Sequence, residues 1–169
     1  MNFFAQIVGL FAVVTLLLSY QQRRRKNIIL LNIVSRVLYI TQYILLRAIE
    51  GAVFDVLGTI SCFAAQSKDK GFLYRYAKII FITISIFIVI VGIFLYKNIF
   101  SLFPVIGVLL QTAALWMNDE KSIRIVSFLS VPFWLIYDLV NGAYAAVLGH
   151  ILTMVSIITS IYRYDIQQK

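Results

Sequence analysis

The stretch GAVFDVLGTI at residues 51–60 recurs as GAYAAVLGHI at residues 142–151, with six of the ten positions identical and no gap between them. In each copy two glycines stand seven positions apart, which predicts that they share one helix face and let a neighbouring helix approach closely. Both copies lie in long apolar stretches. A membrane chain with an internal repeat is typically built from two bundles with a site between them. The repeat therefore predicts two related halves.

The composition places the chain in a lipid bilayer. Of its 169 residues, 62% are hydrophobic and 13% are charged, and the mean hydropathy is +0.92. A soluble domain is about 45–50% apolar and about 25% charged. We therefore expect one membrane domain over residues 1–169, with the bilayer as its main partner. The first apolar stretch has no preceding basic residue and no cleavage site, so it is expected to be a retained span.

Seven segments are long and apolar enough to cross a bilayer, which takes about 20 mostly apolar residues. Their apolar runs are continuous rather than alternating, so we expect helices and no strands. The predicted fold class is all-α, a polytopic membrane protein. The approximate limits are 3–20, 27–46, 50–66, 77–96, 98–117, 122–140 and 142–162.

The order of the segments predicts how the two halves are oriented. Three crossings leave the chain on the far side of the membrane, and a fourth returns it, so that the second triplet inserts in the same direction as the first. This arrangement gives two parallel three-helix bundles related by an axis along the membrane normal. The expected units are a first repeat at 3–66, a linker helix at 77–96 and a second repeat at 98–162.

The basic residues predict the orientation in the membrane. Arg47 and Lys97 fall on one side and Arg36 falls within a span, whereas twelve lie on the other side. The side rich in Lys and Arg faces the cytoplasm. We expect the N-terminus outside and the C-terminus in the cytoplasm. The twelve are Arg23, Arg24, Arg25, Lys26, Lys68, Lys70, Arg75, Lys78, Lys121, Arg124, Arg163 and Lys169.

Gly9, the basic loop leading into Asn32 and the two Gly-Ala-x-x-x-Val-Leu-Gly stretches carry a resemblance. The whole chain resembles the bacterial inner-membrane YgjV-type family. The three-plus-one-plus-three layout is similar to that of SWEET and PQ-loop carriers of sugars and amino acids, and to that of carriers for nicotinamide riboside. The resemblance implies a multi-pass protein of the bacterial inner membrane. The chain departs from those carriers in lacking a Pro-Gln signature and in having prolines, Pro104 and Pro132, only in its second half.

Arg36 is the clearest ionisable residue within a predicted span. Asn32, Tyr39 and Tyr43 share its helix face, at i−4, i+3 and i+7. A charged group at this depth costs about 2.5–3.5 kcal/mol on insertion scales and normally faces the interior of a bundle. The stripe of one cation, one amide and two aromatic rings can bind an anionic or polyhydroxylated ligand. The alternative is a structural Arg held by carbonyls and an acid.

Asp55 and His150 are the candidates for charge balance, gating or proton coupling. Asp55 enters the third segment from the outer side, where it can neutralise Arg36. His150 is the only histidine and matches Thr59 in the other copy of the repeat. A neutral, hydrogen-bonded His is the structural alternative to proton coupling, because the pKa of a histidine ordinarily lies near physiological pH.

The sixth segment adds aromatic and polar candidates on one face, namely Trp134, Tyr137 and Asn141. Trp134 is deep enough to stack on a ring of the solute. Asp138 is close to the outer boundary, where polar ends and aromatic belts are ordinary, so an interfacial position is expected for it.

No pattern of residues indicates catalysis, a cofactor or a metal. There is no Gly-rich phosphate loop, no Gly-x-Ser-x-Gly turn and no metal-ligand spacing, and Cys62 is the single cysteine. We expect no enzyme activity. The basic loops are expected to contact anionic lipid headgroups rather than nucleic acid.

The sequence therefore predicts a transporter that moves a small polar solute by alternating access. The alternative is a membrane scaffold or an assembly partner that transports nothing. The two are separated by whether Arg36, Asp55 and His150 share one cavity. Two triplets in one chain make a monomer sufficient, and a homo-oligomer remains open.

Overall fold

The structure is a computed structural model that describes residues 3–69 and 71–166. Within these residues the chain is all-helical, and its seven long helices are apolar enough to cross a membrane, as the sequence predicts. A 3-10 turn, η1 (Ile99–Ser101), precedes α5, and a π-helical turn, η2 (Ile161–Ile166), follows α7. The helices are α1 (Phe3–Tyr20), α2 (Arg25–Leu45), α3 (Ile49–Ser67), α4 (Gly71–Phe94), α5 (Leu102–Trp116), α6 (Glu120–Val140) and α7 (Tyr144–Ser160).

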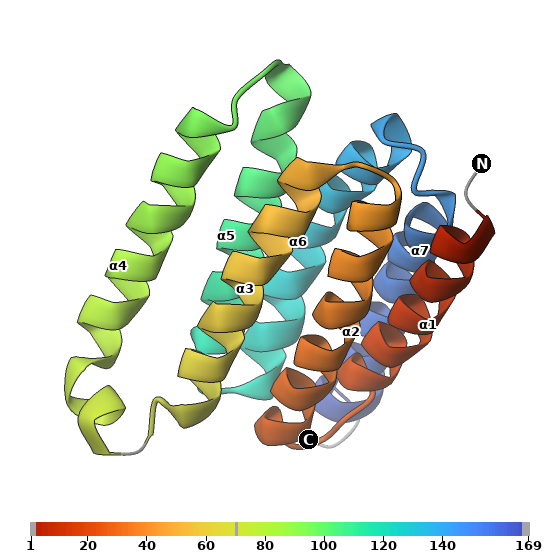
Figure 1. The fold of residues 1–169 in the computed structure, drawn as a ribbon. Coiled ribbons are helices and arrows are strands. Elements are labelled where there is room, and N and C mark those ends of the chain that lie inside the picture. The colour runs from red at the N-terminus through yellow and green to blue at the C-terminus, as the bar shows by residue number, and fades with distance from the viewer. Residues whose placement is uncertain (1–2, 70, 167–169) are drawn as a thin grey trace.

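Six helices close a ring, and α4 lies outside it (Figure 1). Around the ring, α1 packs on α2, α2 on α3, α3 on α5, α5 on α6, α6 on α7 and α7 on α1. Only 11% of the α4 span is buried, compared with 39–50% of the other spans, so α4 is left to contact lipid. The first three helices meet the last three along two seams, α3–α5 and α1–α7.

The two ends of the ring differ in charge. At one end α1, α3, α5 and α7 finish and α2, α4 and α6 begin, and this basic end carries the cationic loops (Figure 1). The hairpin turns α2–α3 and α6–α7 lie at the opposite end. Lys70 and Lys169, which count toward the predicted orientation, lie outside the described residues.

The hairpins α2–α3 and α6–α7 are built alike. Their first helices both have 21 residues, and both turns contain one residue with positive φ, Arg47 (59°) and Gly142 (69°). After each turn, the Ala48 N–H donates to the Tyr43 carbonyl and the Ala143 N–H to the Asp138 carbonyl, both at 2.9 Å. The structural correspondence therefore pairs residues 95 positions apart.

This spacing corrects the alignment of the repeat, which pairs residues 91 positions apart. Gly51 lies in the first turn of α3, whereas Gly142 lies in the turn before α7, so Gly142 and Gly149 do not share a helix face as predicted. A slip of four residues is about one helical turn of 3.6 residues, which keeps small and apolar residues on nearly the same face. In the corrected register His150 corresponds to Asp55 and not to Thr59.

Two glycines bring groups of neighbouring helices together. A Cβ built on Gly149 would lie 2.1 Å from Val13 Cγ2, so the glycine allows α1 and α7 to pack closely. A Cβ on Gly58 would lie 2.2 Å from Arg36 Nη1. The missing side chain on α3 therefore leaves the room that the Arg36 guanidinium occupies.

Candidate functional site

A cavity lies inside the ring and is lined by side chains, many of them of polar residues, from all six of its helices. The volume open to the centres of water molecules is about 40 Å³, which is room for a few waters. Most of the residues expected to form the site line it, namely Asn32, Arg36, Tyr39, Tyr43, Asp55, Trp134 and His150. The others are Leu16, Tyr20, Ser35, Gln111, Ser130, Val131 and Thr153.

Arg36 and Asp55 form a buried ion pair across α2 and α3. Arg36 Nη1 lies 2.5 Å from Asp55 Oδ1, and each side chain is 6% exposed. Asp55 therefore already compensates the arginine charge. An anionic ligand, which the isolated Arg36 stripe suggests, would have to compete with this carboxylate.

Asp138 is fully buried, which corrects the expected interfacial position. Its Oδ2 lies 2.7 Å from His150 Nε2, and its Oδ1 accepts a hydrogen bond of 2.7 Å from the Tyr43 hydroxyl. The residue is close to the end of α6 along the chain, but α7 folds back over it after the turn. The hairpin thus holds an acid–histidine pair inside the ring.

Aromatic rings form one wall of the cavity. Tyr39 stacks on His150 and on Tyr43, both with ring centroids 6.2 Å apart, and Tyr43 stacks on Trp134 at 6.3 Å. Such separations are typical of stacked aromatic rings, so the four rings form one continuous wall.

Amides and hydroxyls line the cavity toward the basic end. Gln111 donates to Asn32 Oδ1 (3.2 Å) and to the Tyr20 hydroxyl (3.1 Å), and accepts from Ser130 (2.8 Å). Sequence reasoning missed Tyr20, Ser35, Ser130 and Thr153 as site residues. Ser35 and Ser130 are 95 positions apart, so the corrected register of the repeat is the signal that would have found them.

Four polar atoms on residues that line the cavity have no hydrogen-bond partner among the described residues. They are Arg36 Nε, Tyr39 Oη, His150 Nδ1 and Thr153 Oγ1. Buried polar groups are almost always hydrogen-bonded, and inside a membrane each unmade bond is costly. Water or a bound solute must therefore supply the missing partners.

Tyr137 and Asn141, which were expected in the binding site, do not line the cavity. The Tyr137 hydroxyl accepts a 2.7 Å hydrogen bond from the Gly51 N–H and so links α6 to α3. The Asn141 side chain donates to the carbonyl of Tyr137 and ends α6. Together with the Tyr43–Asp138 bond, the Tyr137–Gly51 bond closes the ring at the end opposite to the basic end.

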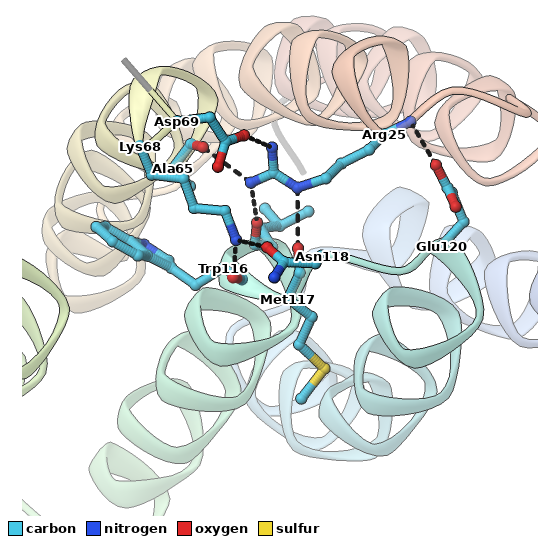
Figure 2. Close-up of polar contacts among 9 residues, drawn as sticks. Arg25, Ala65, Lys68, Asp69, Trp116, Met117, Asn118 and Glu120 are labelled. Carbon is cyan, nitrogen blue, oxygen red and sulfur yellow. Dashed lines mark hydrogen bonds and ion pairs between the residues drawn. The ribbon is translucent and has the colours of Figure 1, made fainter. Parts of the chain in front are cut away.

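Arg25 closes the basic end by joining α2 to the ends of α3 and α5 (Figure 2). Its guanidinium donates to the carbonyls of Ala65 (2.8 Å), Leu115 (3.1 Å) and Met117 (2.9 Å). The last carbonyls of a helix lack partners within it and carry the negative end of the helix dipole, so a cation stabilises them. The backbone N–H of Arg25 also donates to Glu120 at the start of α6.

Lys68 adds a second cation to this contact between the halves (Figure 2). Its ammonium donates to the carbonyl of Trp116 and to Asn118 Oδ1 (2.5 Å). Burial, helped by the charge of Arg25, lowers the pKa of Lys68. We call the contacts of Arg25 and Lys68 with the end of α5 the basic-end clasp.

The comparisons with known proteins give one match. The family model Imp-YgjV, described as a bacterial inner membrane protein, matches residues 3–168. No curated protein and no solved structure matches the chain.

Proposed function

The chain belongs to the Imp-YgjV family of bacterial inner membrane proteins, and we propose that it carries a small, neutral, polar metabolite across that membrane by alternating access. In this proposal α1–α3 and α5–α7 are two like-oriented bundles, similar in layout to SWEET carriers, and α4 connects them. The solute binds in the cavity between them.

The observation that carries the proposal is the charged cavity enclosed by the ring. Four ionisable side chains, Arg36, Asp55, Asp138 and His150, are each at most 6% exposed at the core of the ring. Ionisable groups within membrane segments are expensive and usually mark the path of a solute or ion. Arg36, Asp55 and His150 line one cavity from three helices, and Asp138 bonds to His150 beside it. A scaffold would need no shared cavity, so this convergence favours a carrier.

The contacts between the two proposed bundles supply the two gates. The basic-end clasp closes the side that the positive-inside rule assigns to the cytoplasm, and the Tyr43–Asp138 and Tyr137–Gly51 bonds close the other side. In this proposal, contacts at both gates hold the two bundles together until one gate opens. Because a small-molecule site usually occupies about 300–1,000 Å³, the bundles must separate at one gate before a solute can enter.

Arg36, Tyr39, Thr153 and His150 supply the hydrogen bonds to the solute, through the atoms that lack partners in the protein. The stacked rings supply its contact surface. A neutral solute with several hydroxyl or amide groups satisfies these atoms without disturbing the Arg36–Asp55 pair. This combination favours a polyhydroxylated or amide-bearing metabolite.

Uptake by the purified protein in proteoliposomes tests the proposal, with a panel of radiolabelled neutral metabolites as probes. Tyr39→Phe removes one hydroxyl from the cavity. We expect it to raise the solute concentration that gives half-maximal uptake about tenfold, because a lost hydrogen bond of about 1.4 kcal/mol corresponds to a tenfold weaker affinity. Tyr162→Phe, on a side chain that is 56% exposed, is the matched control and leaves uptake unchanged. Absence of uptake for the whole panel, with folded protein in the vesicles, would count against a carrier.

A further inference from the structure

The buried ionisable side chains that line the cavity, together with Asp138 next to it, do not balance in charge. Arg36 contributes one positive charge, and Asp55 and Asp138 contribute two negative charges. With His150 neutral, the centre of the ring therefore carries a net charge of −1. Other buried cations, Lys68 and Arg124, belong to the basic end.

An uncompensated carboxylate buried between membrane-spanning helices is unfavourable, since charge burial without a partner costs several kcal/mol. One bound proton restores neutrality. We propose that the Asp138–His150 pair binds this proton, and that the proton is the coupling ion of the carrier. The role of the proton as coupling ion rests on the proposed function.

The geometry provides a place for the proton. His150 Nε2 and Asp138 Oδ2 are 2.7 Å apart, the short end of the range for a hydrogen bond between a cation and a carboxylate. The Tyr43 hydroxyl donates to the second oxygen of Asp138 and stabilises it as a carboxylate. In the proton-loaded state both imidazole nitrogens are protonated, with Nε2–H donating to Asp138.

The other imidazole nitrogen provides the route for exchange. His150 Nδ1 has no partner among the described residues, and His150 lines the cavity. In an open state, Nδ1–H can transfer its proton to water in the cavity and leave a neutral imidazole. Net charge then returns to −1, which disfavours closing until a proton is bound again.

Among the described residues, no ion pair or hydrogen bond joins His150 to a cation. Arg36 belongs to Asp55, and α2 otherwise presents the Tyr39 ring, which stacks on the imidazole, and Tyr43. From α6 it meets Asp138, and α1, the other helix packed on α7, contains no charged residue. Asp138 is therefore the charged group to which His150 is hydrogen-bonded.

The single histidine allows a direct test of proton binding. In full-length protein labelled with ¹⁵N-histidine and reconstituted in lipid nanodiscs, every imidazole signal comes from His150. We expect an imidazolium spectrum at pH 7, converting to that of a neutral imidazole as the pH is raised. A neutral imidazole that persists from pH 7 down to pH 5 would overturn the proposal, whatever any variant does.

Asp138→Asn removes the surplus negative charge and is expected to convert the spectrum at pH 7 to that of neutral imidazole. The matched control is Asp119→Asn, at the other end of α6, which leaves the spectrum unchanged. An imidazolium that survives in folded Asp138→Asn protein would contradict the charge balance. The wild-type titration decides the question if this variant does not fold.

Proton coupling is tested separately in proteoliposomes that take up a solute from the panel. With one proton per solute, a gradient of one pH unit drives about tenfold accumulation, and a dye in the lumen reports acidification. His150→Gln is expected to abolish both. Solute uptake that does not depend on the pH gradient would refute proton coupling but would be consistent with a carrier. An imidazolium signal without uptake of any solute would refute the carrier but would be consistent with the proton site.

Discussion

Asp55→Asn is expected to destabilise the protein more than any exposed charge substitution. The change leaves the Arg36 guanidinium, 6% exposed, without its carboxylate. Two unit charges about 4 Å apart interact by about 4 kcal/mol at an effective dielectric constant of 20, and breaking a buried pair typically costs about 3–5 kcal/mol. We expect about 3 kcal/mol, at the lower end, because the carboxylate of Asp138 remains near the same cavity.

The double variant Arg36→Met with Asp55→Asn isolates the pair. With no charge left to compensate, we expect it to lose less than Asp55→Asn alone, since neutral replacements of buried ion pairs are often tolerated. Unfolding of the detergent-solubilised protein, by heat or by titration with a denaturing detergent, measures the differences between variants.

Glu50→Gln is the matched control on the same helix. Glu50 pairs with Lys97 at 2.9 Å, but the lysine side chain is 71% exposed, so the pair contributes about 0–1 kcal/mol. If Asp55→Asn is no more harmful than Glu50→Gln, or if the double variant loses as much stability as Asp55→Asn alone or more, then Arg36 and Asp55 do not form the pair described here.

Four further single changes test the turns, the packing and a helix cap by the same unfolding measurement. Arg47 and Gly142 both have positive φ, which glycine adopts more easily than other residues. Arg47→Gly should therefore stabilise the protein by about 0.5–1 kcal/mol, and Gly142→Ala should destabilise it by about 1 kcal/mol. If both changes stabilise or both destabilise the protein, the turn geometry is contradicted. Gly149→Ala should cost about 1–3 kcal/mol through overpacking, and Val13→Ala in the same chain should restore much of it; no rescue would contradict the close contact of α1 with α7. Asp119→Ala should cost about 1 kcal/mol through loss of the cap of α6. The hydrogen bonds that Asp119 accepts hold its pKa below the ordinary 3.8, so its contribution is present above about pH 4 and lost as the pH falls, and a difference from wild type that persists in acid would contradict this account.

The seven spans could be predicted because each depends on its own apolar run. A span of about 20 residues can be recognised from its apolar composition alone, whatever it packs against. The predicted start of the fourth span, residue 77, lies six residues after the first residue of α4, Gly71, because the helix begins before its most apolar part. Apolar composition locates the membrane crossing and not the ends of the helix.

The register of the repeat could not be read from identities alone. Transmembrane helices use few residue types, and a shift of about one turn preserves the face that packs. The decisive features are the positive φ of Arg47 and Gly142, and a residue name reveals only the second of these, since arginine rarely adopts that conformation.

The sequence predicts the part of the site that lies on one helix face. It does not predict the part that is formed where two helices meet. Arg36 with Asn32, Tyr39 and Tyr43 is a stripe on one helix, and all four line the cavity. Asp138 is buried only because α7 folds back across it and supplies His150. No property of α6 by itself distinguishes that arrangement from an aspartate at the membrane surface.

The two hairpins use corresponding positions for opposite purposes. Asp55 and His150 both stand seven residues after the alanine that precedes their helix, and each pairs with a residue of the helix before, Arg36 in one hairpin and Asp138 in the other. Arginine keeps its charge under all physiological conditions, whereas histidine gains or loses its charge near neutral pH. In our proposal, one hairpin therefore holds a fixed ion pair, and the other holds the pair that binds the coupling proton. Two copies of the first hairpin would lack the histidine, and two copies of the second would lack the permanent cation, so the proposed coupling proton depends on two unlike halves in a single chain.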